Sequence, residues 1–247
     1  WRGSNDPFLF FMCIAFIKRE NDKILLAFNR DEEYARSHSS IQEQPQEKRI
    51  YGIDHKAGGT WLTFDYLGNF SFVTNVRKKS DFKSEANSRG EIPFLCMSGR
   101  DPVGNTYNPF NSITFLNNKL EYRNYLNKES ILISDNLFGI SNAIYPIEWE
   151  KVQRGKALFN NLSLDDNYLF DSVLKVMQDQ EKSQNIPMDT GFSEAQEYFL
   201  SSIFLKSNDC GTVSTTLALI DNNDIFIKEL NYINDTEINI KLTKENL

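Results

Sequence analysis

The sequence predicts a layered α+β fold, because strand-like segments come first, helix-like segments follow, and strand-like segments return near the end. From residue 13 to 141, short apolar runs alternate with turn residues. From residue 147 to 204, apolar side chains recur at helical spacing, and strand character returns from 213 to 230. This order is typical of α+β proteins and argues against alternating βαβ units.

The fold is predicted to open with a β-hairpin. Its strands are two largely apolar runs, 13–17 and 23–28, separated by a polar stretch. A turn centred near Glu20-Asn21 pairs Cys13 with Phe28 or its neighbour.

The middle of the chain is predicted to hold a surface loop and then a series of strands. The loop covers 37–48, which is polar and contains Pro45. Glycine and asparagine pairs suited to tight turns separate the strands that follow, expected at 60–64, 70–76, 111–116, 120–126, 130–134 and 137–141. A short helix is expected after Gly90, within a less regular segment.

Three helices and a second hairpin are predicted beyond residue 146. The helices are expected at 147–161, 166–179 and 194–204, with Asp165 or Asp166 as N-cap of the second. The hairpin consists of strands at 213–220 and 225–230, joined by a turn at 221–223.

Composition limits the function classes. The chain of 247 residues is 40% hydrophobic and carries a net charge of −7, which suits one sizeable core and gives no basic stripe for a nucleic acid. Residues 12–247 are predicted to form a single domain. The short basic run Arg77-Lys78-Lys79 is interpreted as a solvated loop.

Residues 1–11 are interpreted as a leader or an upstream extension of the reading frame. The apolar stretch 8–17 lacks the flanks of a signal peptide and is too short to span a bilayer, which needs about 20 apolar residues. The three cysteines form no C-x-x-C pair, so neither a zinc site nor a disulfide framework is indicated. A reducing compartment fits, either the cytoplasm or an organelle matrix.

Cys13 follows the first methionine, Met12. Removal of Met12 would leave a residue that carries both a thiol and a free α-amine. The thiol has an ordinary pKa of about 8.5 and the amine one of about 7.7–8.0, so the amine can accept the thiol proton. No histidine is needed, and His38 and His55 are both expected at the surface in loops. A buried structural cysteine is the commoner alternative.

Polar residues near the end of the hairpin complete a candidate site. With the expected register, residues 29–31 lie within a few residues of the thiol, and Asp31 is the carboxylate suited to hold the α-amine. Asn75 and Asn142 each end an apolar strand and could donate to the oxyanion of an acyl-transfer intermediate. Each could equally be an ordinary turn asparagine.

The sequence resembles the NRDE-motif family of transport and Golgi organisation protein 2. The resemblance extends in order along nearly the whole chain, through Met12-Cys13-Ile14, Asn29-Arg30-Asp31-Glu32, Gly58-Gly59-Thr60-Trp61-Leu62, Val73-Thr74-Asn75, Ser88-Arg89-Gly90-Glu91, Asn108-Pro109-Phe110-Asn111, Gly139-Ile140-Ser141-Asn142-Ala143 with Trp149, and Gly211-Thr212-Val213-Ser214-Thr215-Thr216.

The resemblance implies a four-layer αββα sandwich of two antiparallel sheets, similar to N-terminal-nucleophile hydrolases. Cys13 would be the nucleophile, Asp31 the residue that positions the amine, and the oxyanion and positioning donors would be Asn75 and Asn142. Substrate contacts are predicted at Asn29, Arg30, Trp61 and Arg89, although the block around Trp61 also resembles a structural turn with a core tryptophan. Val213 stands where the family usually has an arginine, which argues against full catalytic competence.

Three functions stay open at this point. The first is hydrolysis of an amide or thioester of a small-molecule substrate, with no cofactor and no metal. The second, also implied by the resemblance, is a carrier of haem or of a lipid or acyl ligand, for which His38, His55 and Cys13 are the candidate axial ligands. The third is a structural scaffold that retains an inherited fold.

Overall fold

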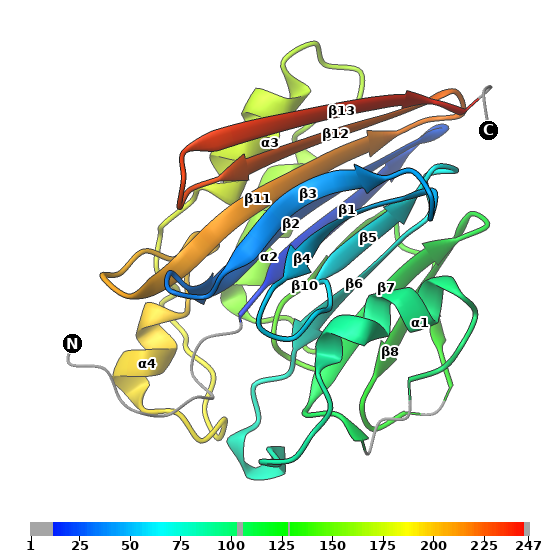
Figure 1. Cartoon of the computed structure of the whole chain (residues 1–247). Coiled ribbons are helices and arrows are strands. Elements are labelled where there is room, and N and C mark those ends of the chain that lie inside the picture. The colour runs from blue at the N-terminus through cyan, green and yellow to red at the C-terminus, as the bar shows by residue number, and fades with distance from the viewer. Residues whose placement is uncertain (1–11, 103–105, 128, 245–247) are drawn as a thin grey trace.

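Two antiparallel sheets pack face to face in the computed structural model, which describes residues 12–102, 106–127 and 129–244 (Figure 1). Sheet A has the strand order β10-β1-β2-β11-β12-β13, and sheet B the order β3-β4-β5-β6-β7-β8-β9. The strands of sheet A are β1 Ile14–Glu20, β2 Lys23–Glu33, β10 Leu137–Ile140, β11 Cys210–Ile220, β12 Asp224–Asn231 and β13 Thr236–Thr243. Those of sheet B are β3 His38–Gln44, β4 Arg49–Asp54, β5 Leu62–Asp65, β6 Phe70–Asn75, β7 Phe110–Leu116, β8 Lys119–Asn124 and β9 Ile131–Ile133.

The main core lies between the two sheets, and helices cover their outer faces. Phe28 of sheet A meets Phe72 of sheet B in this core, with ring centroids 5.3 Å apart. The outer face of sheet A packs against α2 (Glu150–Asn160) and α3 (Leu169–Met177), as in the stack of Phe16 on Phe159. The short α1 (Ile92–Met97) packs on sheet B (Figure 1). The predicted α+β sandwich of two antiparallel sheets is confirmed.

The opening hairpin forms with a different register. Glu20 pairs with Lys23 and Ile14 pairs with Asn29, so the turn is Asn21-Asp22 and not a turn centred near Glu20-Asn21. Asn21 has a φ of 56°, which asparagine tolerates better than most residues. Continuing this register by one residue sets Cys13 opposite Arg30, so the expected pairing with Phe28 or its neighbour is wrong by one to two residues.

The predicted surface loop at 37–48 is wrong, because β3 occupies most of it. This strand is at the edge of sheet B, and all of its residues except Ile41 are polar, so the sequence shows no alternation of apolar and polar residues there. Ile41 alone is buried in it, and its backbone N–H donates to Glu229 of β12 at 2.9 Å. The strands β4 and β13 were also not predicted; β13 is another edge strand.

The remaining elements lie close to their predicted positions, with shorter helices. The third predicted helix is only α4 (Glu194–Phe199), and α1 begins two residues after Gly90. The predicted N-cap of α3 is wrong, since Tyr168 occupies that position without a side-chain cap. Asp166 instead accepts a hydrogen bond from the Tyr168 backbone at 2.8 Å in the preceding turn.

Within the described ranges, no helix combines the length and the apolar character needed to cross a bilayer. The expected leader, residues 1–11, lies outside the described residues.

Candidate functional site

The strand β2 continues through Glu33, so the whole Asn29-Arg30-Asp31-Glu32 block is part of sheet A. Because successive side chains of a strand point to opposite faces, the block is divided between two environments. Asn29 and Asp31 face the helical layer, where Asn29 donates to the carbonyls of Met177 (2.8 Å) and Ile203 (3.1 Å). Arg30 faces the space between the sheets, with its guanidinium 3.9 Å from the ring centroid of Trp61.

A cleft of about 280 Å³ opens where Cys13 and this end of β2 meet the loops of sheet B. The side chains that matter to its chemistry are those of Cys13, Arg30, Glu32, Trp61, Asn75 and Arg89. Glu32 was not predicted for the site. Of the eight residues that were, six line this cleft: Cys13, Arg30, Asp31, Trp61, Asn75 and Arg89.

Cys13 lies in the cleft floor with only 8% of its surface exposed. Burial raises the pKa of its thiol to about 12, and the negative charges of Asp31 and Glu32 act in the same direction. The backbone N–H of Asp31 and the charge of Arg30 oppose this rise in pKa. With Met12 still attached, the thiol is therefore protonated at neutral pH and needs a base before it can act as a nucleophile.

The Asp31 carboxyl is buried on the helical side of sheet A, and burial raises its pKa to about 7. Its Oδ1 accepts a hydrogen bond from Thr212 Oγ1 at 2.6 Å. In the part of the chain that the structure describes, no hydrogen-bond partner reaches Oδ2. Met12 lines the same small cavity as Asp31, together with Leu200 and Leu205. One acceptor of a buried carboxylate is thus unpaired beside the residue that precedes Cys13.

A β-bulge in β11 supplies the partners of the two residues on the helical side. Thr212 pairs with Asp31 and Ser214 pairs with Arg30, so Val213 is the extra residue. This shift allows Thr212 to reach Asp31 while Thr215 donates to Asn29 Oδ1 at 2.7 Å. A regular strand would point two residues with this spacing to opposite faces.

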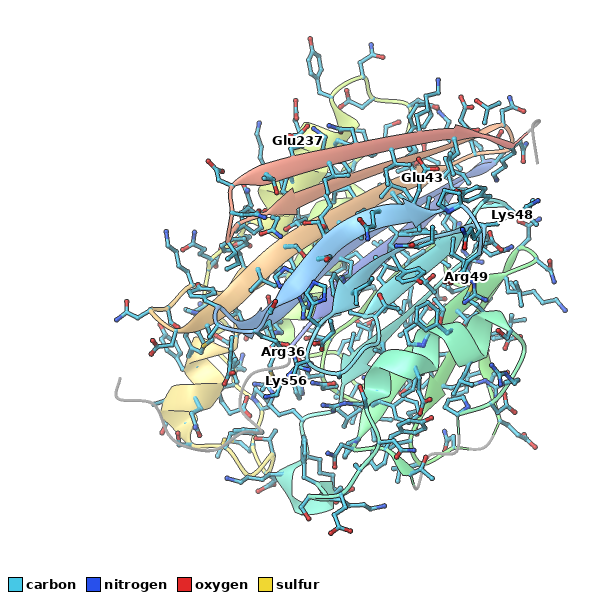
Figure 2. All side chains as sticks on the ribbon, viewed as in Figure 1. Arg36, Glu43, Lys48, Arg49, Lys56 and Glu237 are labelled. Carbon is cyan, nitrogen blue, oxygen red and sulfur yellow. The ribbon has the colours of Figure 1, made fainter. Side chains whose placement is uncertain are left out.

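A chain of charged groups continues from Arg30 along the side of the cleft. Arg30 Nη2 lies 3.7 Å from Glu32 Oε2, and Arg36 Nε lies 3.5 Å from the same oxygen. Arg36 Nε also donates to Asp54 Oδ2 at 2.9 Å. Burial raises the pKa of Glu32 to about 8, although both arginines favour its ionised form. Arg36 lines the cleft, and Figure 2 shows it with Lys56 at the end of the β3–β4 hairpin opposite Lys48 and Arg49.

Two glycines allow the loops of sheet B to close against each other at the cleft wall. A Cβ on Gly59 would lie 2.5 Å from the carbonyl carbon of Gly90, and Thr60 donates its N–H to Gly90 O at 2.9 Å. The neighbouring Arg89 reaches across to donate to Pro109 O at 3.1 Å. Both motif blocks therefore contribute to one wall.

Asn75 and Asn142 have different positions relative to the cleft. Asn75 lines it, at the end of β6. Asn142 is fully buried behind it: its Nδ2 donates to Asn75 O at 2.9 Å and its Oδ1 accepts from Ser141 Oγ at 2.8 Å. Asn142 thus holds the strand end that carries Asn75. Asn29, predicted to contact substrate, is similarly engaged with the protein and does not line the cleft.

Neither histidine lines the cleft. His38 is in β3, not in the expected loop, and packs edge-on against Trp61 with centroids 5.8 Å apart. His55 follows β4, where its Nε2 lies 2.8 Å from Ser39 Oγ. Of the three axial haem ligands considered above, only Cys13 has access to the cleft.

Sequence reasoning missed a buried charged layer behind Asp31. The interpretation of Arg77 as part of a solvated loop is wrong, because Arg77 is buried, with Nη1 2.7 Å from Glu197 Oε2 and its guanidinium 4.1 Å from the Trp149 centroid. Lys151, on α2, is also buried. A lysine or arginine in a polar segment gives no signal of burial, since its partners come from distant parts of the sequence. Thr212 belongs to a recognised motif but was assigned no role.

Comparison with known proteins agrees with these motifs. The family model described as Transport and Golgi organisation 2 matches residues 12–236. The chain is 27% identical to the Transport and Golgi organization 2 homolog of Mus musculus, over 86% of this chain and 90% of the mouse protein. It is 26% identical to the Transport and Golgi organization protein 2 homolog of Homo sapiens, over 85% of this chain and 89% of the human protein.

Proposed function

Because this chain belongs to the Transport and Golgi organisation 2 family, we propose that it is an N-terminal-nucleophile hydrolase-like member that cleaves an amide or thioester after Met12 is removed. The observation that carries this proposal is the placement of Cys13 and Asp31. The thiol lines a cleft, while Asp31 Oδ2, which has no partner among the described residues, lies in the cavity that Met12 also lines. Removal of Met12 would free an α-amine next to that oxygen.

Each step follows from the groups present. The α-amine, held by Asp31, takes the proton of the Cys13 thiol, and the sulfur forms a bond to the substrate carbonyl carbon. The amine then returns the proton to the departing nitrogen or sulfur as the carbonyl bond to that atom breaks. Water attacks the acyl-enzyme and restores the thiol. Asn75 lines the cleft, which supports the assignment of its amide as the donor to the oxyanion.

The cleft also favours polar recognition of the substrate. The guanidinium of Arg30 stacks on Trp61 in the cleft lining, and Arg89 adds a second guanidinium group to that lining. All three cysteines are free thiols, which supports a reducing location such as the cytoplasm or an organelle matrix.

The experiment begins with the intact mass of the protein purified from cells, which should correspond to a chain that starts at Cys13. Hydrolysis is then measured on a panel of small amides and thioesters, with mass spectrometry of the Cys13 peptide to trap the acyl adduct. Cys13→Ala should abolish both signals. Cys96→Ala is the matched control, because Cys96 is a buried thiol in a different cluster. If Cys13→Ala hydrolyses the amides and thioesters at an unchanged rate, the proposal is refuted.

A second candidate is a non-catalytic carrier of haem or of a lipid or acyl ligand in the same cleft. Its support is what weakens the nucleophile: the raised pKa of the Cys13 thiol disfavours the reactive thiolate, and Val213 stands in place of the expected arginine. A haemin titration followed by absorbance, read beside the hydrolysis assay, separates the two functions. If the cleft carries haem, the Soret band shifts and the shift is lost in Cys13→Ala. If it carries a lipid or acyl ligand, the band is unchanged and no Cys13-dependent hydrolysis is found, whereas the hydrolase function predicts an unchanged band with Cys13-dependent hydrolysis.

A further inference from the structure

We propose that Lys151 is a positioning residue that keeps Asp31 ionised, so that Asp31 can hold the α-amine of Cys13. This inference rests on the proposed function for its consequence, but the link between the two side chains can be measured without any substrate.

The first line of support is the position of Lys151. It lies on the inner face of α2 with 1% of its surface exposed, and its Nζ donates to Leu200 O at 2.9 Å. Leu200 lines the small cavity that also contains Asp31 and Met12. The ammonium group therefore binds the backbone of a residue that lines the same cavity as Asp31.

The second is the charge balance of this buried layer. Arg77 and Glu197 form an ion pair at 2.7 Å and largely neutralise each other. Lys182 is half-buried, and its Nζ donates to Phe199 O at 2.6 Å and to Ser202 Oγ at 2.9 Å. Among the residues that the structure describes, Asp31 is the acid left to face both Lys151 and Lys182. A buried charge without an opposite charge is strongly destabilising, so Asp31 and the fully buried Lys151 each favour the ionised form of the other.

Electrostatics agree with this geometry. Burial raises the pKa of Asp31, and the largest effect that opposes the rise is the positive charge of Lys151, followed by the Thr212 hydrogen bond and Lys182. Burial and the charge of Arg77 lower the pKa of Lys151, whereas Asp31 and Glu197 raise it. The other titratable groups that sense Asp31 are the thiols of Cys13 and Cys210 and the hydroxyl of Tyr34.

The test is a carbon NMR titration of aspartate side-chain carboxyls in the protein that starts at Cys13. The Asp31 signal is identified by its absence in Asp31→Asn. In Lys151→Met, the midpoint of this signal should move to higher pH by about 1 unit, the lower end of what one nearby opposite charge produces. Lys151→Arg keeps the charge and should restore the midpoint.

Lys156→Met is the matched control, because Lys156 is on the same helix but pairs with Glu148 at a partly exposed site. It should leave the Asp31 midpoint unchanged. If Lys151→Met folds, as shown by circular dichroism, and also leaves the midpoint unchanged, Lys151 is only structural and the inference is overturned. Should Lys151→Met fail to fold, Lys151→Gln takes its place, because it keeps a donor for Leu200 O and loses the charge. A midpoint raised by about 1 unit then supports the inference, and an unchanged midpoint refutes it.

The two proposals fail separately. A protein with a normal Lys151 effect but no Cys13-dependent hydrolysis refutes the function and leaves the inference intact. If both hold, the acid limb of the hydrolysis rate should move to higher pH in Lys151→Met by the same amount as the NMR midpoint.

Discussion

The ion pair between Arg77 and Glu197 should be one of the most consequential charged contacts for stability. Both side chains are at most 2% exposed, and their nearest charged atoms lie 2.7 Å apart. Glu197→Gln keeps an acceptor for Thr190 Oγ1, which donates to Glu197, but leaves the guanidinium buried without its counter-charge. Breaking a buried pair in this way costs about 3–5 kcal/mol. For a chain of this size, that corresponds to a fall in Tm of roughly 6–20 °C.

The matched control is Glu148→Gln. Lys156 lies at the same 2.7 Å from Glu148, but those side chains are 26% and 24% exposed, so the loss should be at most about 1 kcal/mol. Urea denaturation at neutral pH measures both variants. The double variant Arg77→Met/Glu197→Met should lose less than Glu197→Gln, because it removes both charges together. Equal losses in Glu197→Gln and Glu148→Gln would refute the reasoning.

Two further predictions concern the cleft. Burial raises the pKa of Glu32 from its ordinary value of 4.5 to about 8. This group therefore stabilises the fold below the lower value, and the stabilisation is lost as pH rises through the higher one. Glu32→Gln should flatten the fall in unfolding free energy over that window, and parallel plots of unfolding free energy against pH, measured by urea denaturation, would contradict this. Gly59→Ala should cost about 1–3 kcal/mol by overpacking, because its Cβ would meet the Gly90 backbone at 2.5 Å. Gly58→Asn is its control, since Gly58 has open space and a φ of +73° that asparagine tolerates; equal thermal stability of Gly59→Ala and Gly58→Asn would show that the wall can relax.

Strands with one buried and one solvated face, or with two buried faces, were the part of the fold that the sequence could predict. Their apolar periodicity placed the hairpin of β1 and β2 and the hairpin of β11 and β12. Polar strands were the part it could not predict. The edge strands β3 and β13 and the inner strand β4 carry many polar residues and were missed, whereas the more apolar edge strands β9 and β10 were predicted. The hairpin register also needed the structure, because shifting a turn by one residue changes every pairing by two.

The sequence identified Cys13 as the candidate nucleophile and Asp31 as the candidate carboxylate. It did not show the surroundings of either side chain. The alternation of a strand separates Arg30 from Asp31, but only the bulge at Val213 brings Thr212 onto the face of Asp31. The roles of Asn29 and Asn142 depended in the same way on where their amide groups found partners.

By itself, the sequence determined local properties of this protein: most of the apolar segments that form strands, and which nucleophile and carboxylate are available. Only the tertiary structure decided which charges are buried. The physical reason is that the cost of burying Lys151, Arg77 or Asp31 depends on opposite charges and dipoles supplied by other elements, which no local pattern in the sequence specifies.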